Sequence, residues 1–299
     1  VKSESKYQTS LKEGYATLLA LPGVGNATAE QLYEAGFASA EVSLNFGVYA
    51  SDKPTTMVKK LKPILNDLEQ VISQELDEPV SIRMQVSSNY ENGIRAIASG
   101  EVDFARLGPA SYVEALEMDS AIRLLAMESK NGSKRFNGVI CASGASQVQS
   151  VTELKGKRFA FGDERSTIGR YLSQQYLLQH GVTAADLATY KYLGRHDRVG
   201  YAVAAGEFDA GALKESTFNK LLKKGVVLRP IATFQNVTKP WVARSGMSER
   251  VFSALRLALF EYKDPEGLKA LGKDGFVAGS EEDFSPIVTA VRNNPEFFK

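Results

Sequence analysis

Two stretches in which short apolar runs alternate with amphipathic helical patterns constrain this chain most strongly. In the first stretch, apolar runs over 44–49, 80–86 and 102–107 are separated by helical periodicity over 57–76 and 93–99. Strands that alternate with helices predict an α/β fold with mostly parallel strands. Ligands of such sheets bind beyond the carboxyl ends of the strands, so the loops after these runs are the candidate binding loops.

The same alternation begins again after Phe136. Further strands are predicted over 139–142, 159–161, 191–193 and 209–213, and closing helices over 248–262 and 285–293. A first lobe, a second lobe and a return to the first require two crossings, which we place near 136–139 and 233–240. Two lobes joined in this way predict a cleft that closes on a ligand.

Composition excludes several classes of function. The 299 residues are enough for about two domains, and a net charge of +1 gives no general reason to expect nucleic acid or an anionic membrane as partner. Two histidines and one cysteine argue against a zinc site, and no cofactor is predicted. Cys141 lies in an apolar run, which predicts a buried structural thiol. Residues 1–10 are polar and lack the apolar core of a signal peptide, so we expect a chain that is cytosolic or already processed.

The turn after the run 159–161 is a candidate anion site. Gly162 and Asp163 end the run, and Ser166 and Thr167 then begin a helical pattern that continues to Leu178. A Ser or Thr at the N-cap leaves backbone N–H groups free at the positive end of the helix dipole, which suits a small oxyanion. An ordinary helix cap with no ligand is the alternative.

Residues 1–43 differ from the rest of the chain. Helical patterns over 15–21 and 27–35 flank the turn 22–25, and together they resemble a helix-hairpin-helix unit. In that family the hairpin binds nucleic-acid phosphate. Here the segment holds three lysines and five glutamates, a net charge of −2, whereas binding to duplexes depends on Lys and Arg. We therefore expect a packing or protein-contact module and no nucleic-acid partner.

Several segments, in order, resemble the phosphonate/phosphite/phosphate-type periplasmic solute-binding proteins of ABC transporters, over roughly 44–299. They are Leu44–Val48, Ser88–Tyr90, Gly100–Pro109, Ser166–Gly169, Gly194–Asp197 and Gly206–Gly211. The resemblance implies an α/β fold, a two-lobed type II periplasmic-binding-protein clamshell, preceded here by the small helical hairpin. It divides the chain into a helix-hairpin-helix-like segment, the first part of lobe 1, lobe 2 and a return segment of lobe 1: 1–43, 44–136, 137–236 and 237–299.

The resemblance also implies ligand-binding residues. Ser166 and Thr167 would donate to an anionic oxygen, His196 would donate from the loop after its strand, and Tyr90 would offer its phenol from the opposite lobe. Glycines of the same motifs complete the implied binding loops, and a carboxylate is expected beyond Asp209: Gly108, Gly169, and Glu215 or Ser216.

The chain departs from the family pattern at Leu107, where the family often has a tyrosine. Several arginines near the candidate loops suit a more highly charged or bulkier anion: Arg106, Arg165, Arg170, Arg195 and Arg198. The alternative for these arginines is solvation, or pairing with Asp163, Glu164 and Asp197.

The implied function is capture of a small phosphorus oxyanion (phosphonate, phosphite or phosphate) in the periplasm, for the membrane permease of an ABC importer. A ligand-sensing input domain of the same fold, acting on a signalling receptor or kinase, is the alternative. No Ser/His/Asp spacing, nucleophile elbow or P-loop accompanies the candidate residues, so we do not expect an enzyme.

Overall fold

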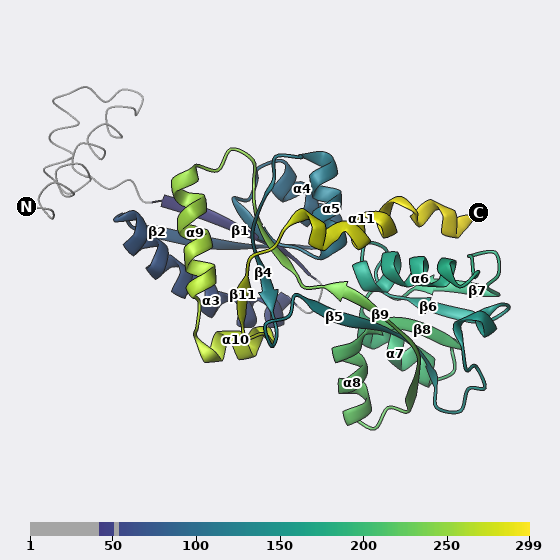
Figure 1. The fold of residues 1–299 in the computed structure, drawn as a ribbon. Coiled ribbons are helices and arrows are strands. Elements are labelled where there is room, and N and C mark those ends of the chain that lie inside the picture. The colour runs from purple at the N-terminus through teal and green to yellow at the C-terminus, as the bar shows by residue number, and fades with distance from the viewer. Residues whose placement is uncertain (1–41, 51–53) are drawn as a thin grey trace, which may run out of the picture.

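The computed structural model describes residues 42–50 and 54–299, and the predicted hairpin in residues 1–41 lies outside them. The described residues form two β-sheets, each with helices on both faces (Figure 1). The α/β architecture with two sheets matches the prediction.

The first sheet has six strands in the order β11-β4-β10-β3-β1-β2. Their bounds are Val42–Tyr49 (β1), Val80–Ser87 (β2), Phe104–Arg106 (β3), Arg123–Ser129 (β4), Pro240–Ala243 (β10) and Gly275–Val277 (β11). Strand β1 pairs in parallel with β2 and β3, whereas β10 pairs antiparallel with β3 and β4. Helices α3 (Pro54–Leu76) and α9 (Glu249–Glu261) share one apolar cluster, and α4 (Tyr90–Ala98) and α5 (Pro109–Met118) belong to another.

The second sheet has five strands in the order β7-β6-β8-β5-β9. Their bounds are Arg135–Ser143 (β5), Arg158–Phe161 (β6), Thr189–Tyr192 (β7), Ala210–Lys214 (β8) and Leu228–Val237 (β9). Helices α7 (His196–Ala204) and α8 (Glu215–Lys223) share one apolar cluster with this sheet. The continuous helix formed by η2 (Thr167–Leu172) and α6 (Ser173–Gln179) belongs to the cluster that also contains α4 and α5.

The chain crosses between the sheets from β4 to β5 and again from β9 to β10. The two crossing segments are paired: Thr238 N donates to Lys134 O at 2.8 Å, and Glu128 N donates to Lys239 O at 3.1 Å. The first crossing therefore precedes Arg135, earlier than predicted, because β5 already begins there. The strands at the crossings, β4, β5, β9 and β10, pair antiparallel with their neighbours, so the prediction of mostly parallel strands is wrong for them.

The C-terminal end of the chain lies across both parts of the molecule (Figure 1). Helix α11 (Ser285–Arg292) contacts α5 and η2, and η4 (Asn294–Phe298) packs on α6. Ala184 N donates to Phe297 O at 2.8 Å. The last residues of the segment predicted to return to lobe 1 thus pack beside the second sheet. The shorter elements are η1 (Val151–Leu154), α10 (Pro265–Leu271) and η3 (Glu281–Phe284).

Two side chains noted in the sequence lie in the core. Trp241 is fully buried in β10, with its ring centroid 5.0 Å from that of Phe46, and packs inside the first sheet's core. Cys141 is buried in β5 as predicted, and burial raises the pKa of its thiol to about 12. Among residues 42–50 and 54–299, no helix is long and apolar enough to span a membrane.

Candidate functional site

A cavity of about 240 Å³ lies between the two sheets and is lined by residues from both. Five helices begin at its wall: α4, α5, η2, α7 and α8. Each follows the carboxyl end of a strand, directly for α8 after β8 and through a short loop for the helices after β2, β3, β6 and β7. The N-terminus of a helix carries a partial positive charge, so this convergence favours an anion.

Ser166 is the N-cap of η2, as the sequence predicts, and its Oγ accepts a hydrogen bond from Gly169 N at 3.0 Å. The first turns are π-helical and not α-helical, with Tyr171 N donating to Ser166 O at 3.3 Å. Within the described part of the chain, the N–H groups of Thr167 and Ile168 have no hydrogen-bond acceptor. Both residues line the cavity, so these two donors are available to a ligand.

The Thr167 hydroxyl has a second role that the sequence did not reveal. Its Oγ1 accepts a hydrogen bond from Ala110 N at 2.9 Å, and Ala110 lies in the first turn of α5. This bond joins the start of η2, beside the second sheet, to the start of α5, beside the first. Thr167 therefore holds the two helix N-termini together at the cavity wall.

Gly108 lines the cavity as predicted, and a phenol lies directly against it. Gly108 N donates to Tyr49 Oη at 2.5 Å, and a Cβ at residue 108 would lie 2.7 Å from that oxygen. Only glycine fits this close approach. Tyr49 also lines the cavity and exchanges a hydrogen bond with Ser111 Oγ at 2.9 Å, and burial raises the pKa of its phenol to about 12. Sequence reasoning missed Tyr49, because nothing in the apolar run of β1 distinguishes its last residue.

Tyr90 and His196 face the cavity from opposite sheets, as predicted. The Tyr90 ring stacks on Tyr49 with centroids 4.1 Å apart, and burial raises its pKa well above the ordinary value. His196 Nδ1 is buried and has no hydrogen-bond partner among the described residues. Burial, and then the charges of Lys214 and Lys239, lower the pKa of His196 to about 4. The imidazole is therefore neutral at neutral pH and has one nitrogen available to a ligand.

Two predicted site residues lie away from the cavity lining. Gly169 packs against Gly162, whose Cα would be 2.7 Å from a Cβ at residue 169, so this glycine allows the helix to approach the loop after β6. Glu215 Oε1 accepts from Asn137 Nδ2 at 3.4 Å and does not line the cavity. Ser216 does line it, although the residue is exposed. Lys214, the residue before Glu215, also lines the cavity, where the resemblance implied a carboxylate.

The part of the cavity nearest the crossings is strongly cationic. Arg106 Nε lies 2.5 Å from Glu128 Oε1, and Lys273 Nζ lies 3.8 Å from Glu128 Oε2. Burial raises the pKa of Glu128, but the charges of Arg106 and Lys273 outweigh burial and hold it below its ordinary value. Burial and the neighbouring cations lower the pKa of Lys214 to about 8 and that of Lys239 well below its ordinary value. Of this group, sequence reasoning singled out only Arg106.

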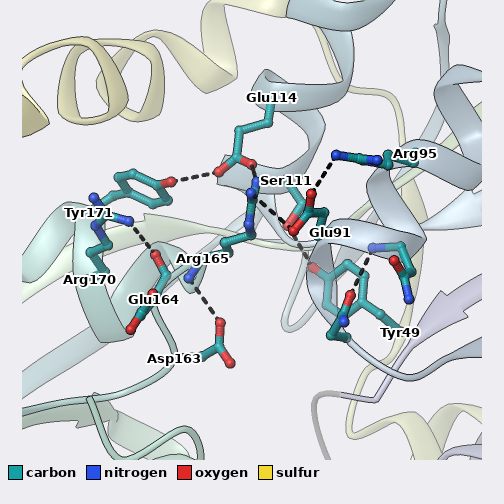
Figure 2. A network of polar contacts seen from close by, with 12 residues as sticks. Tyr49, Glu91, Arg95, Ser111, Glu114, Asp163, Glu164, Arg165, Arg170 and Tyr171 are labelled. Atoms are coloured by element: carbon teal, nitrogen blue, oxygen red, sulfur yellow. Dashed lines mark hydrogen bonds and ion pairs between the residues drawn. The ribbon is translucent and has the colours of Figure 1, made fainter. Parts of the chain in front are cut away.

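Polar contacts also join the two sheets beside the cavity, as Figure 2 shows. Arg165, in the loop before η2, lies 2.7 Å from Glu114 on α5 and 3.6 Å from Glu91 on α4. Tyr171 Oη donates to Glu114 Oε1 at 2.7 Å. We call Arg165, Glu114, Glu91 and Tyr171 the latch, because these contacts hold the sheets in their present arrangement.

Two other candidate arginines, Arg195 and Arg170, have local partners. Arg195 forms an ion pair with Asp197 at 2.6 Å, and Arg170 donates to the backbone oxygen of Glu164 at 2.8 Å. No group of His, Cys, Asp and Glu side chains that could hold a metal ion occurs within the described residues.

Comparison with known proteins agrees with this arrangement. A "Phosphonates-binding periplasmic protein" of Escherichia coli is 24% identical over 265 residues, which cover 83% of this chain and 75% of that protein. A "Probable ABC transporter phosphite binding protein" of Prochlorococcus marinus is 27% identical over 171 residues, 54% of this chain and 57% of that protein. The match thus spans just over half the length of that relative. The solved structure of PhnD1 from P. marinus in complex with methylphosphonate has a TM-score of 0.71, with 22% identity over 84% of this chain and 97% of that one, and shows a common fold.

The family model described as "ABC transporter, phosphonate, periplasmic substrate-binding protein" matches residues 46–284. Proteins of this family are extracytoplasmic substrate-binding components of transport systems that use a small ligand and a membrane permease. The chain belongs to this family.

Proposed function

We propose that this protein binds a small phosphorus oxyanion between its two sheets and delivers it to the membrane permease of an ABC importer, without catalysing a reaction. The observation that carries the proposal is the convergence of five helix N-termini on one cavity. The N–H groups of Thr167 and Ile168, the His196 imidazole and the Tyr90 phenol are suited to hydrogen-bond phosphonate-type oxygens.

The site residues proposed for this role are those that both the resemblance and the cavity support: Tyr90, Gly108, Ser166, Thr167, His196 and Ser216. Ser166 Oγ accepts from Gly169 N and keeps its own O–H proton as a donor at the cavity wall. Closure of the lobes would bury the anion, and the latch would stabilise the closed arrangement.

The experiment is isothermal titration of phosphate, phosphite and methylphosphonate, with sulfate as the competitor anion. We expect at least one phosphorus anion to bind with micromolar or tighter affinity, and to raise the melting temperature as expected for binding to the native state alone. The His196→Phe variant removes the free ring nitrogen and is expected to weaken this binding by about tenfold or more. Absence of binding by every phosphorus anion would reject the proposal.

Delivery to a permease and input to a signalling receptor are separated by a partner assay. A pull-down of the ligand-loaded protein against membrane extracts is expected to recover a permease. Recovery of a kinase without a permease would favour the sensor alternative, which rests on residues 1–43.

A further inference from the structure

The charged side chains around the cavity restrict the net charge of its ligand, which the helix N-termini alone do not. Among the described residues that line the cavity, six are lysine or arginine and none is aspartate or glutamate: Lys60, Arg106, Arg195, Lys214, Lys220 and Lys239. A ligand carrying an ammonium group would find no carboxylate in this lining. Arg106 and Arg195 pair with Glu128 and Asp197, which lie outside the lining, so we take Lys214 and Lys239 as the lining cations that bind the ligand.

The positive charge is concentrated at one place, between the crossings and the end of β8. We call Arg106, Lys214, Lys239 and Lys273 the basic cluster. The only carboxylate ion-paired with a member of this cluster, within the described part of the chain, is Glu128, which contacts Arg106 and Lys273. Among the same residues, no carboxylate lies within ion-pair distance of Lys214 or Lys239. The formal charge of the cluster and Glu128 together is +3, from four cations and one anion.

Lys214 and Lys239 are held in place by aromatic rings. Lys214 Nζ lies 4.8 Å from the ring centroid of Phe136, and Lys239 Nζ lies 5.6 Å from that of Tyr49. Both rings line the cavity, so the two ammonium groups stay at its wall. Bringing like charges together in a partly buried site is unfavourable unless an anion neutralises them. Burial, and then the neighbouring cations, lower the pKa values of both lysines.

The helix N-termini and the basic cluster form two different anion-binding regions of one cavity. The first offers neutral donors, namely the N–H groups of Thr167 and Ile168 with the His196 imidazole, and it suits one phosphonate group. The second offers ammonium and guanidinium groups. The volume of about 240 Å³ equals on the order of eight water molecules. One phosphonate group fills only part of this space, which leaves room for a further group the size of a carboxylate.

We infer that the ligand is a small phosphonate or phosphate ester that carries a second anionic group. Lys214 and Lys239, at the side of the cavity where Arg106 lies, bind this second group. Aminophosphonates are rejected. This inference rests on the proposed function and specifies its substrate class. The second group is a carboxylate or a second phosphorus oxyanion, since both are planar or compact oxyanions that ammonium and guanidinium groups bind well.

The test compares three phosphonates of similar size by isothermal titration at pH 7: ethylphosphonate, 2-aminoethylphosphonate and phosphonoacetate. We expect phosphonoacetate to bind at least about tenfold more tightly than ethylphosphonate. We expect 2-aminoethylphosphonate to bind at least about tenfold more weakly than ethylphosphonate. Equal or tighter binding of ethylphosphonate would overturn the inference and leave the proposed function intact. If none of the three binds, and phosphate and phosphite do not bind either, the proposed function fails and the inference fails with it.

A charge reversal tests the same point from the protein side. Lys214→Glu is expected to reverse the preference, so that 2-aminoethylphosphonate binds more tightly than phosphonoacetate. Lys223→Glu, an exposed position on α8 away from the cavity lining, is the matched control and should keep the wild-type order. If Lys214→Glu does not fold, Lys214→Met should reduce the preference for phosphonoacetate over ethylphosphonate to about threefold or less. An unchanged preference in the folded variant would refute the role of Lys214.

Discussion

Replacing Lys214 by methionine should make the empty protein more stable and its ligand binding weaker. Methionine keeps the unbranched shape of the side chain and removes the ammonium group, which stands at the cavity wall beside Lys239 and near the Phe136 ring. A residue retained only for packing or stability would respond in the opposite way to the loss of its charge. The two measured signs therefore separate a binding role from a structural one.

The expected gain in stability follows from the pKa of Lys214. Burial and neighbouring cations lower it from 10.5 to about 8, and each pKa unit corresponds to about 1.4 kcal/mol between the two protonation states. At pH 7 the charged side chain thus destabilises the folded state by at most about 3 kcal/mol. Hydration of the partly exposed ammonium group reduces this destabilisation. Subtracting about 1 kcal/mol for the lost contact with Phe136 leaves a gain of about 2 kcal/mol, or roughly 3 °C in melting temperature for a chain of this length.

The dependence on pH has a definite sign. Because the folded-state pKa lies below the unfolded one, protonation opposes folding: the advantage of methionine is full below pH 8, shrinks as the pH rises from 8 to 10.5, and vanishes above 10.5.

The assay is urea unfolding of the empty wild-type and Lys214→Met proteins at pH 7 and at pH 10.5, with Lys223→Met as the control for loss of an exposed lysine. Titration of phosphonoacetate at pH 7 measures the affinity, which we expect to fall by about thirtyfold or more with the loss of a charge-assisted contact. A Lys214→Met protein that is less stable than the wild type at pH 7, or that binds phosphonoacetate equally well, would refute the reasoning.

Three further predictions concern the latch, the phenol at the helix start and the pH dependence of binding. Glu114→Gln removes the carboxylate that Arg165 contacts across the two sheets, so the Kd for ligand should rise about threefold to tenfold. The rise should come mainly from faster dissociation, measured by stopped flow. An unchanged dissociation rate would show that the latch does not stabilise closure. Tyr49→Phe leaves the buried N–H of Gly108 without its acceptor and should lower the free energy of unfolding by about 1–3 kcal/mol in urea titrations, whereas a neutral effect would mean that water replaces the phenol. Affinity for anions should fall as the pH rises through about 8, where Lys214 loses its proton, by up to about tenfold per pH unit, and titrations of Lys214→Met should lack this component.

The parts of the fold that the sequence predicted well are those set by local patterns. Helix α3 and strands β1 and β2 were predicted from the spacing of apolar residues within each segment. Ser166 was recognised as a candidate N-cap because capping depends only on neighbouring residues. The antiparallel strands at the crossings were not predicted as such. Their direction depends on the order in which the chain enters each sheet, which no local pattern records.

The cavity separates in the same way into local and non-local parts. The anion-binding region at the helix N-termini comes from short motifs, each at the start of one helix. The resemblance was built on these motifs, and four of the residues that it singled out line the cavity: Tyr90, Gly108, Ser166 and His196. The resemblance left Glu215 and Ser216 as alternatives, and of these only Ser216 lines the cavity, with Lys214 beside it at the end of β8. Lys214 is the last residue of β8, whereas Glu215 and Ser216 already belong to the first turn of α8.

The basic cluster could not be read from any stretch of sequence, because its members come from β3, the end of β8, the second crossing and the segment after α10. The pairing of the two crossings, which includes the bond from Glu128 N to Lys239 O, helps to bring these cations together, and Arg106, Lys214 and Lys239 line the cavity. The motifs that assign the family therefore describe the region that binds the phosphorus group. The basic cluster, which would bind the second anionic group, lies largely outside these motifs. Because the motifs contain none of Lys214, Lys239 and Lys273, they do not specify the charge at that end of the cavity, and the ligand of this protein has to be determined from the basic cluster as well as from the motifs.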